Sequence, residues 1–147
     1  MRILIGRPEL PYPPSWGYAI RVSQFLALLA RRHSVSLLTY TRDGDEANLE
    51  ALAGICGRVH AVPGGGLQSS AKRFSQLLSL GASRSFQGSY LYSEAMQQKL
   101  DELCSDQPFD IIQVETSQMA TFSFDPRSAL IIDEHDVVYE LLDRIAS

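Results

Sequence analysis

The stretch MRILIGRPELPYPPSWGYAIRVSQFLALLARRHSVSLLTY, residues 1–40, decides the fold class of this chain. It begins with a short apolar run at Ile3–Ile5 and ends with a second at Val35–Tyr40. Between them, apolar side chains recur at helical spacing and form one stripe: Tyr18, Val22, Phe25, Leu26 and Leu29. Short continuous apolar runs are typical of parallel strands covered on both faces. The stretch therefore predicts a strand, a crossover helix and a second, parallel strand.

The rest of the chain repeats this pattern. Further apolar runs predict three more strands, at Val59–Val62, Ile111–Val114 and Leu130–Ile132. Helical stripes precede the fourth strand and recur more briefly in the middle of the chain, at Met96, Leu100 and Leu103 and at Phe74, Leu77 and Leu78. Residues 67–92 otherwise show no clear strand. Repeated strand–helix–strand units imply right-handed crossovers, so we predict an α/β fold: a Rossmann-like, doubly wound parallel sheet in the order 3-2-1-4-5.

Composition indicates one globular domain over residues 1–147. Hydrophobic residues make up 45% of the chain and charged residues 20%, which separates it from disordered, charge-rich sequences. The formal net charge of -4 argues against a general nucleic-acid binder, because such proteins need excess Lys and Arg to displace counterions from phosphates. We therefore expect a single folded core and no nucleic-acid partner.

The cysteines and the chain start bear on location. Cys56 and Cys104 lie beside apolar residues and outside any CxxC or Cys/His cluster, so we expect buried structural thiols and a reducing compartment. The apolar run at the start is too short for a signal peptide, and no stretch approaches the roughly 20 apolar residues of a membrane span. The sequence predicts a cytoplasmic protein, with the inner face of the membrane as the alternative.

Basic residues gather in and around two predicted helices: Arg21, Arg31, Arg32, Lys72, Arg73 and Arg84. A solvated face is the ordinary interpretation of such a cluster. The alternative is peripheral contact with anionic lipid headgroups, to which each basic residue adds about 1 kcal/mol. His33 and His60 stand at unrelated places, one after a helix and one in a strand, so we predict no metal site.

Ligands of open α/β sheets bind beyond the carboxyl ends of the strands, which directs attention to three loops. The first, RPELPYPPSWGY, contains four prolines and then Gly17, just before the first helix. A glycine here lets a ligand approach the backbone, and the helix start offers N–H groups to an anion. The loop is not the GxGxxG dinucleotide motif, so we do not expect NAD binding. A plain helix-start glycine is the alternative for Gly17.

The segments after the fourth and fifth strands carry the other candidates. His135 and Asp136 stand in IIDEHDVVYELL, and neighbouring carboxylates can orient a histidine that grips sugar hydroxyls or a phosphate. Alternatively, Asp136 caps a helix and His135 packs at a turn. Glu115 follows the fourth strand and could hold an acceptor hydroxyl, although SQMATF also fits a short helix capped by Thr116 or Ser117.

These residues carry a family resemblance. The opening 40 residues resemble those of bacterial glycosyltransferase family 4 proteins, which show a strand, a PPYPP-like loop, a glycine pair, an Arg on the first helix and a second strand after ARRHEV. FDIIQVET, residues 109–116, is similar to the family's fourth strand, and IIDEHDVVYELL, residues 131–142, to its D-x-H-[DN] segment. The chain departs from the pattern at Tyr18, where many members have the second glycine.

The resemblance implies a GT-B enzyme that transfers a sugar, with retention, from a nucleoside diphosphate sugar to a hydroxyl acceptor in polysaccharide or glycoconjugate synthesis, without a cofactor. The acceptor would be a glycan or a lipid-linked glycan. His135 would be the catalytic cleft histidine, and the donor phosphate or the acceptor would contact the remaining candidates: Gly17, Tyr18, Arg21, Glu115 and Asp136.

In such an enzyme a second domain binds the donor, and the resemblance covers only the first domain. The apolar stripe at Val138, Leu141, Leu142 and Ile145 continues to the end without a Gly cap or Pro stop, so we expect a donor domain to follow and the 147 residues alone to be inactive. The alternatives are a stand-alone, flavodoxin-like module that binds a nucleotide or phosphate, and a non-catalytic relative of GT-B enzymes.

Overall fold

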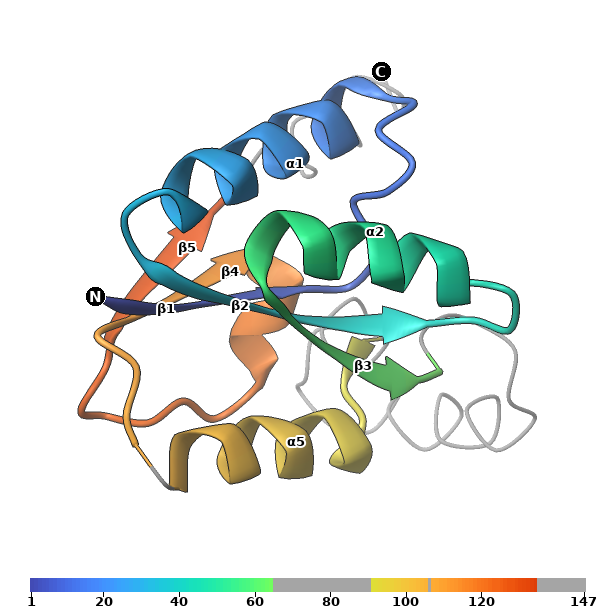
Figure 1. Ribbon diagram of the computed structural model, residues 1–147. Helices are drawn as coiled ribbons and strands as arrows, with labels where there is room; N and C mark the ends of the chain where they lie inside the picture. The colour runs from blue at the N-terminus through green and yellow to red at the C-terminus, as the bar shows by residue number, and fades with distance from the viewer. Residues whose placement is uncertain (65–90, 106, 135–147) are drawn as a thin grey trace, which may run out of the picture.

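A five-stranded, all-parallel sheet forms the centre of the molecule (Figure 1). The computed structural model describes residues 1–64, 91–105 and 107–134. The sheet has the order β3-β2-β1-β4-β5, and its strands are β1 (Arg2–Arg7), β2 (Ser34–Thr41), β3 (Arg58–Pro63), β4 (Ile111–Glu115) and β5 (Ala129–Asp133). The predicted Rossmann-like class, the five strands and their order are all confirmed.

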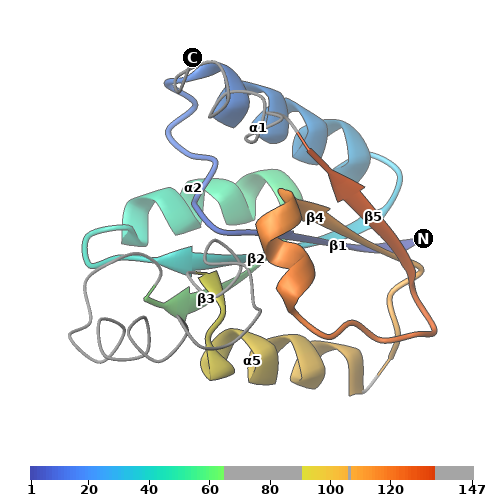
Figure 2. The same ribbon diagram turned by 180° about the vertical axis from the view of Figure 1, so that it is seen from behind.

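Helices cover both faces of this sheet (Figures 1 and 2). The helices α1 (Gly17–Ala30) and α2 (Glu46–Cys56) lie on one face, and α5 (Glu94–Ser105) lies on the other with the short 3-10 helix η1 (Ser117–Thr121). The helices predicted from the stripes at residues 18–29 and 96–103 are confirmed as α1 and α5. The sequence pattern did not predict α2, which is short and contains Gly54.

The core has two parts, one on each face of the sheet. Alternate residues of a strand point to opposite faces, so Leu4 joins the cluster under α5, whereas Ile3 and Ile5 join the cluster under α1 and α2. Cys104 belongs to the first cluster and Cys56 to the second, and both are buried free thiols, as predicted. Burial raises the pKa of each thiol, which keeps both protonated and unreactive at neutral pH.

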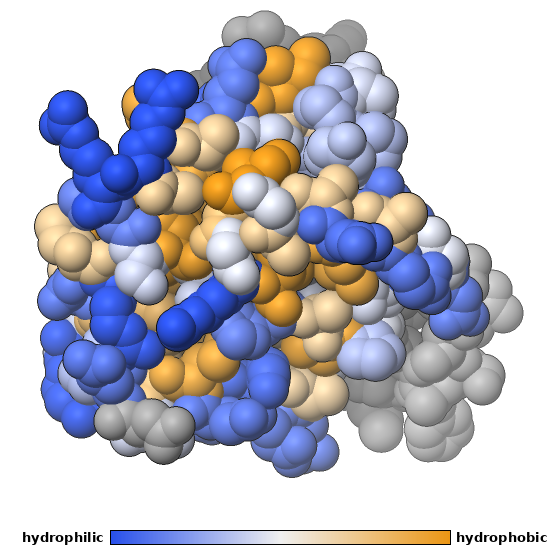
Figure 3. Space-filling view, in the orientation of Figure 1, coloured by the Kyte–Doolittle hydropathy of each residue, from blue (hydrophilic) through white to orange (hydrophobic). Residues whose placement is uncertain are grey.

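The outer surface is mixed in polarity. Figure 3 shows hydrophilic side chains over much of one face, with apolar side chains between them near its middle. The edge strand β5 is different, because Leu130, Ile131 and Ile132 are all exposed by more than 40%, at 45%, 43% and 48%. No helix in the described part of the chain has the length and apolar character to cross a bilayer. The stripes predicted at residues 74–78 and 138–145 lie outside the described residues.

Candidate functional site

Three charged side chains form a row at the carboxyl edge of the sheet. Arg7, Glu115 and Asp133 are the last residues of the neighbouring strands β1, β4 and β5. Glu115 pairs directly with Asp133 in the sheet register, and the register that pairs Ile5 with Gln113 places Arg7 beside Glu115. Arg7 lies two residues after Ile5 and four after Ile3, so it shares their face of the sheet, and the row lies on the face that α1 covers.

The first turn of α1 packs over this row. Tyr18 and Arg21 are three residues apart and therefore share one side of the helix. The Tyr18 hydroxyl donates to Oε2 of Glu115 at 3.4 Å, and Arg21 forms an ion pair with Asp133. Burial, together with the Glu115 carboxylate, raises the pKa of Tyr18 well above its usual value, although Arg7 opposes the shift. Tyr18 and Arg21, predicted from the opening segment, therefore lie in one cluster with Glu115, which was predicted from the segment at the fourth strand.

Arg7 and Asp133 are the members of the cluster that were not predicted from the sequence, and Arg7 is the more unusual of the two. It has no exposed surface, and its guanidinium carbon lies 4.4 Å from the centre of the Tyr18 ring. None of its three guanidinium nitrogens has a hydrogen-bond partner among the residues that the structure describes. Burial lowers the pKa of the guanidinium, while Tyr18 and Glu115 act to raise it. The available signal was a charged residue that ends the strand RILIGR directly after its four uncharged central residues.

Glu115 is also buried, at 1% exposure, and accepts a hydrogen bond on each oxygen. The Gln113 amide donates to Oε1 at 2.7 Å, and Tyr18 donates to Oε2. These contacts come from its own strand and from α1, so they fix the carboxylate against both layers of the fold. A buried carboxylate held in this way is a rigid, negatively charged acceptor at the strand end.

Thr116, the residue after Glu115, has a strained backbone, and the start of η1 that follows it is capped by a different residue from those considered in the sequence. Thr116 has a φ of 96°, which costs a β-branched residue about 1–3 kcal/mol. Its hydroxyl is buried without a hydrogen-bond partner in the described ranges, so Thr116, one of the two caps considered for η1, occupies the N-cap position without capping through its side chain. The Glu134 carboxylate instead accepts from the Ser117 N–H at 2.6 Å. A residue beyond β5 thus supplies the cap.

The start of α1 is open toward solvent. Trp16 occupies the N-cap position and makes no side-chain cap hydrogen bond, and the first turn contains no acidic residue. A Cβ on Gly17 would meet nothing within 4 Å, and Gly17 does not adopt a left-handed conformation. Neither the backbone nor the packing of the described residues requires glycine here. The helix start therefore offers N–H groups that the Trp16 side chain does not cap, and the positive end of the helix dipole.

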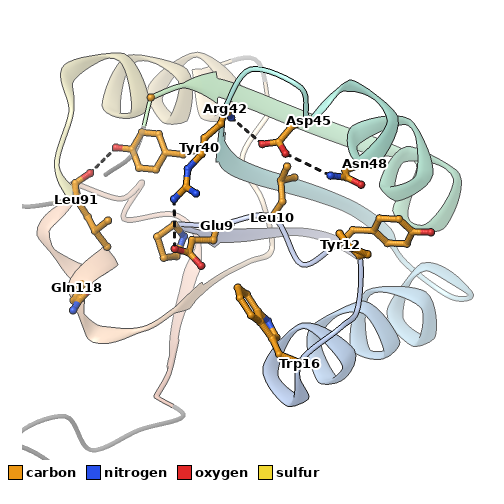
Figure 4. Close-up of a pocket in the computed structure, with 13 residues that line it drawn as sticks. Glu9, Leu10, Tyr12, Trp16, Tyr40, Arg42, Asp45, Asn48, Leu91 and Gln118 are labelled. Atoms are coloured by element: carbon orange, nitrogen blue, oxygen red, sulfur yellow. Dashed lines mark hydrogen bonds and ion pairs between the residues drawn. The ribbon is translucent and has the colours of Figure 1, made fainter. Parts of the chain in front are cut away.

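A pocket of about 340 Å³ lies at the same edge of the sheet (Figure 4). The segments that follow β1, β2, β3 and β4 all contribute to its wall: six residues of the proline loop (Pro8, Glu9, Leu10, Tyr12, Pro13 and Trp16), and Arg42, Gly64 and Gln118. Trp16 and Tyr12 line one part and Tyr40 and Leu91 another, as Figure 4 shows. Five polar side chains line the same pocket: Glu9, Arg42, Asp45, Asn48 and Gln118.

Hydrogen bonds hold the polar wall of this pocket in place. The Tyr40 hydroxyl donates to the carbonyl oxygen of Leu91 at 2.5 Å and lies 2.9 Å from the Ser93 hydroxyl. The Asp45 carboxylate accepts from the backbone N–H of Arg42 at 2.8 Å. These contacts tie the end of β2 to the starts of α2 and α5. The pocket is therefore framed by ordered secondary structure, with the proline loop as its remaining wall.

Two candidate residues cannot be placed. His135 and Asp136 lie outside the described residues, although β5, which precedes them, ends at Asp133 beside Glu115. Arg31 and Arg32 are exposed beyond α1, whereas Lys72, Arg73 and Arg84 also lie outside the described ranges. The membrane contact therefore stays a prediction. Within residues 1–64, 91–105 and 107–134, no three His, Cys, Asp or Glu side chains gather to hold a metal ion.

No protein-family model matches the chain, and no curated protein matches its sequence. The carboxyl edge of the sheet combines three features: an aromatic and polar pocket, a buried charged cluster and a helix start that its N-cap residue Trp16 leaves without a side-chain cap.

Proposed function

We propose that this chain is the acceptor-side domain of a retaining glycosyltransferase of the GT-B type, acting on a nucleoside diphosphate sugar. In this reaction the bond between the sugar and the diphosphate breaks, and a bond from the sugar to an acceptor oxygen forms. The acceptor hydroxyl loses its proton, and the diphosphate leaves with the negative charge. The enzyme must therefore hold a polyhydroxyl acceptor and stabilise an anion.

The pocket beside the proline loop is the observation that carries this proposal. Aromatic rings pack against the apolar faces of sugar rings, and Trp16, which is 49% exposed, offers such a surface, whereas the Tyr12 ring packs against the core. Carboxylates and amides bind hydroxyl groups, and Glu9, Asn48 and Gln118 supply them around the rings. A pocket of this kind at the carboxyl edge of a parallel sheet favours a glycan or lipid-linked glycan as acceptor.

The neighbouring cluster supports the anion-stabilising half of the reaction. The open start of α1 and the cations Arg7 and Arg21 place positive charge at the same edge of the sheet. Preorganised dipoles and cations stabilise the charge on a leaving group when a cleft closes around it. In the proposal, His135 and Asp136 stand beyond β5 at the reacting sugar, Glu115 orients the acceptor side, and a second domain binds the nucleotide.

Sugar transfer by the protein in its gene-encoded length tests this proposal directly. A panel of nucleoside diphosphate sugars is assayed for release of the nucleoside diphosphate in the presence of oligosaccharide and lipid-linked acceptors. Trp16→Ala should raise the KM for the acceptor roughly tenfold, because it removes a stacking surface worth about 1.4 kcal/mol, and should leave the KM for the donor unchanged.

Leu28→Ala is the matched control. Leu28 is exposed by 60% on α1, and its loss removes apolar surface away from the residues that line the pocket. Equal KM values for the acceptor in the wild type and both variants would show that the pocket does not bind the acceptor. Absence of transfer with every donor, in a folded protein, would contradict the enzyme proposal itself.

A further inference from the structure

Arg7 is fully buried, yet its charge is not satisfied by hydrogen bonds. Its exposed fraction is 0%, and its Nε, Nη1 and Nη2 atoms all lack an acceptor among the described residues. A buried polar group without a partner costs about 1–3 kcal/mol, and a charged one costs more. Proteins pair nearly all such groups, so an unpaired guanidinium indicates a group whose partner is a ligand.

The surrounding side chains do not supply the missing acceptor. Asp133 forms its ion pair with Arg21, and Glu115 accepts from Gln113 and Tyr18. Within the described part of the chain, every ion pair belongs to another cation, so no carboxylate oxygen lies within 4.0 Å of a nitrogen of Arg7. The Tyr18 ring stacks on the guanidinium. Such stacking covers the face of the cation, whereas the N–H groups point outward in its plane.

A second group of donors begins at the same place. Tyr18, which touches Arg7, is the second residue of α1, and the residue before it, Gly17, faces open space. Trp16 gives the helix start no side-chain cap, and the first turn contains no acidic residue. A helix N-terminus alone is a general feature of proteins, but here it stands next to a buried, unpaired cation. Both features favour the same ligand chemistry, a negatively charged oxygen.

We propose that Arg7 and the start of α1 form a binding site for a phosphate oxyanion, with the guanidinium as its anchor. The planar fork of an arginine binds two phosphate oxygens at once, and the helix N–H groups bind the oxygens that remain. Because Arg7 has no exposed surface, entry of the anion requires a local outward movement of the first turn of α1 or the proline loop. Binding is therefore coupled to opening of this edge.

The source of the phosphate rests on the proposed function. In a sugar transferase the oxyanion is the diphosphate of the donor or of the leaving nucleotide, whereas a simple binding module would hold free phosphate. The two sources share the same chemistry at Arg7. They differ in whether the nucleoside adds affinity, so inorganic phosphate, pyrophosphate and uridine diphosphate are the appropriate probes.

Thermal unfolding and isothermal titration of the 147-residue chain with these three probes test the site. In the wild type each anion that binds should raise the Tm and give a measurable Kd. Arg7→Gln should abolish the Tm increase, and Arg7→Lys should weaken the Kd at least tenfold, because an ammonium keeps the charge but loses the bidentate fork. Arg32→Gln, an equal charge change at the opposite edge of the sheet, should behave as the wild type.

Each outcome bears on the site. A wild-type Kd in Arg7→Gln or Arg7→Lys would overturn it, as would the lack of binding of all three probes to the folded wild type. If Arg7→Gln does not fold, Arg7→Lys alone decides. Arg7-dependent phosphate binding by a protein that transfers no sugar would support the site and leave the enzyme proposal unsupported. Sugar transfer in which the Arg7 variants have the wild-type KM and Kd for the donor would support the enzyme proposal and overturn the site.

Discussion

Two arginines stand at the two ends of the same strand, and their surroundings are opposite. Arg2, at the start of β1, donates from Nη1 to the carbonyl oxygens of Gln107 and Pro108 at 2.6 and 3.0 Å, and its guanidinium carbon lies 4.7 Å from the centre of the Phe109 ring. Arg7, at the end of β1, also lies over an aromatic ring but donates to nothing among the described residues.

The difference separates a structural edge of the sheet from a functional one. At the amino edge, Arg2 ties the segment before β4 to β1, and its charge is satisfied within the fold. At the carboxyl edge, the fold leaves donors unsatisfied and a strained Thr116 next to Glu115. Natural proteins keep such costs chiefly where function requires them. The same residue type on one strand therefore serves stability at one end and, in our proposal, ligand binding at the other.

Substitution of Glu115 should produce the largest effect. Glu115→Gln keeps the shape of the side chain but removes the negative charge that acts on Arg7, leaving the buried guanidinium without compensation. The free energy of unfolding should fall by about 3 kcal/mol, because a buried donor that now bonds the carboxylate loses its acceptor and the buried cation loses the nearby negative charge. Urea denaturation measures this change, with Glu102→Gln on the exposed side of α5 as a control that should alter it by less than about 1 kcal/mol.

Phosphate sharpens this result. If an oxyanion binds at Arg7, it restores negative charge beside the guanidinium, so phosphate should stabilise Glu115→Gln more than it stabilises the wild type. If phosphate stabilises Glu115→Gln and the wild type equally, the anion binds away from Arg7 and Glu115. A Glu115→Gln protein as stable as the wild type would mean that Arg7 does not depend on Glu115 at all.

Arg2→Ala should have a smaller effect of a different kind. It removes two hydrogen bonds from a charged donor and one contact with an aromatic ring at a partly exposed position, so the free energy of unfolding should fall by about 1–2 kcal/mol. Because the amino edge takes no part in the proposed site, the Kd for phosphate should equal that of the wild type. A loss of phosphate binding in Arg2→Ala would contradict the assignment of phosphate binding to the carboxyl end of β1 alone.

The sequence predicted what local patterns encode. Near-continuous apolar runs identified all five strands, because strands buried on both faces leave that pattern, and the stripe from Tyr18 to Leu29 identified α1. The helix α2 was missed because it is only 11 residues long and its apolar positions are mixed with alanine and Gly54. Its existence depends on packing against the sheet more than on its own pattern.

Contacts between distant segments could not be predicted in the same way. Tyr18 and Glu115 were each candidates, but they are 97 residues apart, and only the sheet register brings them together. Arg7 was overlooked because a charged residue at a strand end is ordinarily solvated, and its burial depends on α1 packing across it. The cap of η1 by Glu134 likewise comes from the neighbouring strand end, whereas the local sequence pattern indicated Thr116 or Ser117.

Gly17→Ala should have the smallest effect on stability and is the finest test of the carboxyl edge. The Ala methyl group meets nothing within 4 Å, and the backbone conformation suits any residue, so the free energy of unfolding should change by less than about 0.5 kcal/mol. If a phosphate lies against the first N–H groups of α1, however, that methyl group narrows its approach. The Kd for phosphate should then rise roughly threefold to tenfold, a loss of about 0.7–1.4 kcal/mol in binding free energy.

Isothermal titration of Gly17→Ala is compared with that of Gly54→Ala, since Gly54 is a glycine in α2 whose added methyl group also meets nothing within 4 Å. The comparison separates this effect from a general consequence of replacing glycine. An unchanged Kd in Gly17→Ala would leave Arg7 as the anchor but exclude the helix start from the site, and Gly17 would then be an ordinary helix-start residue.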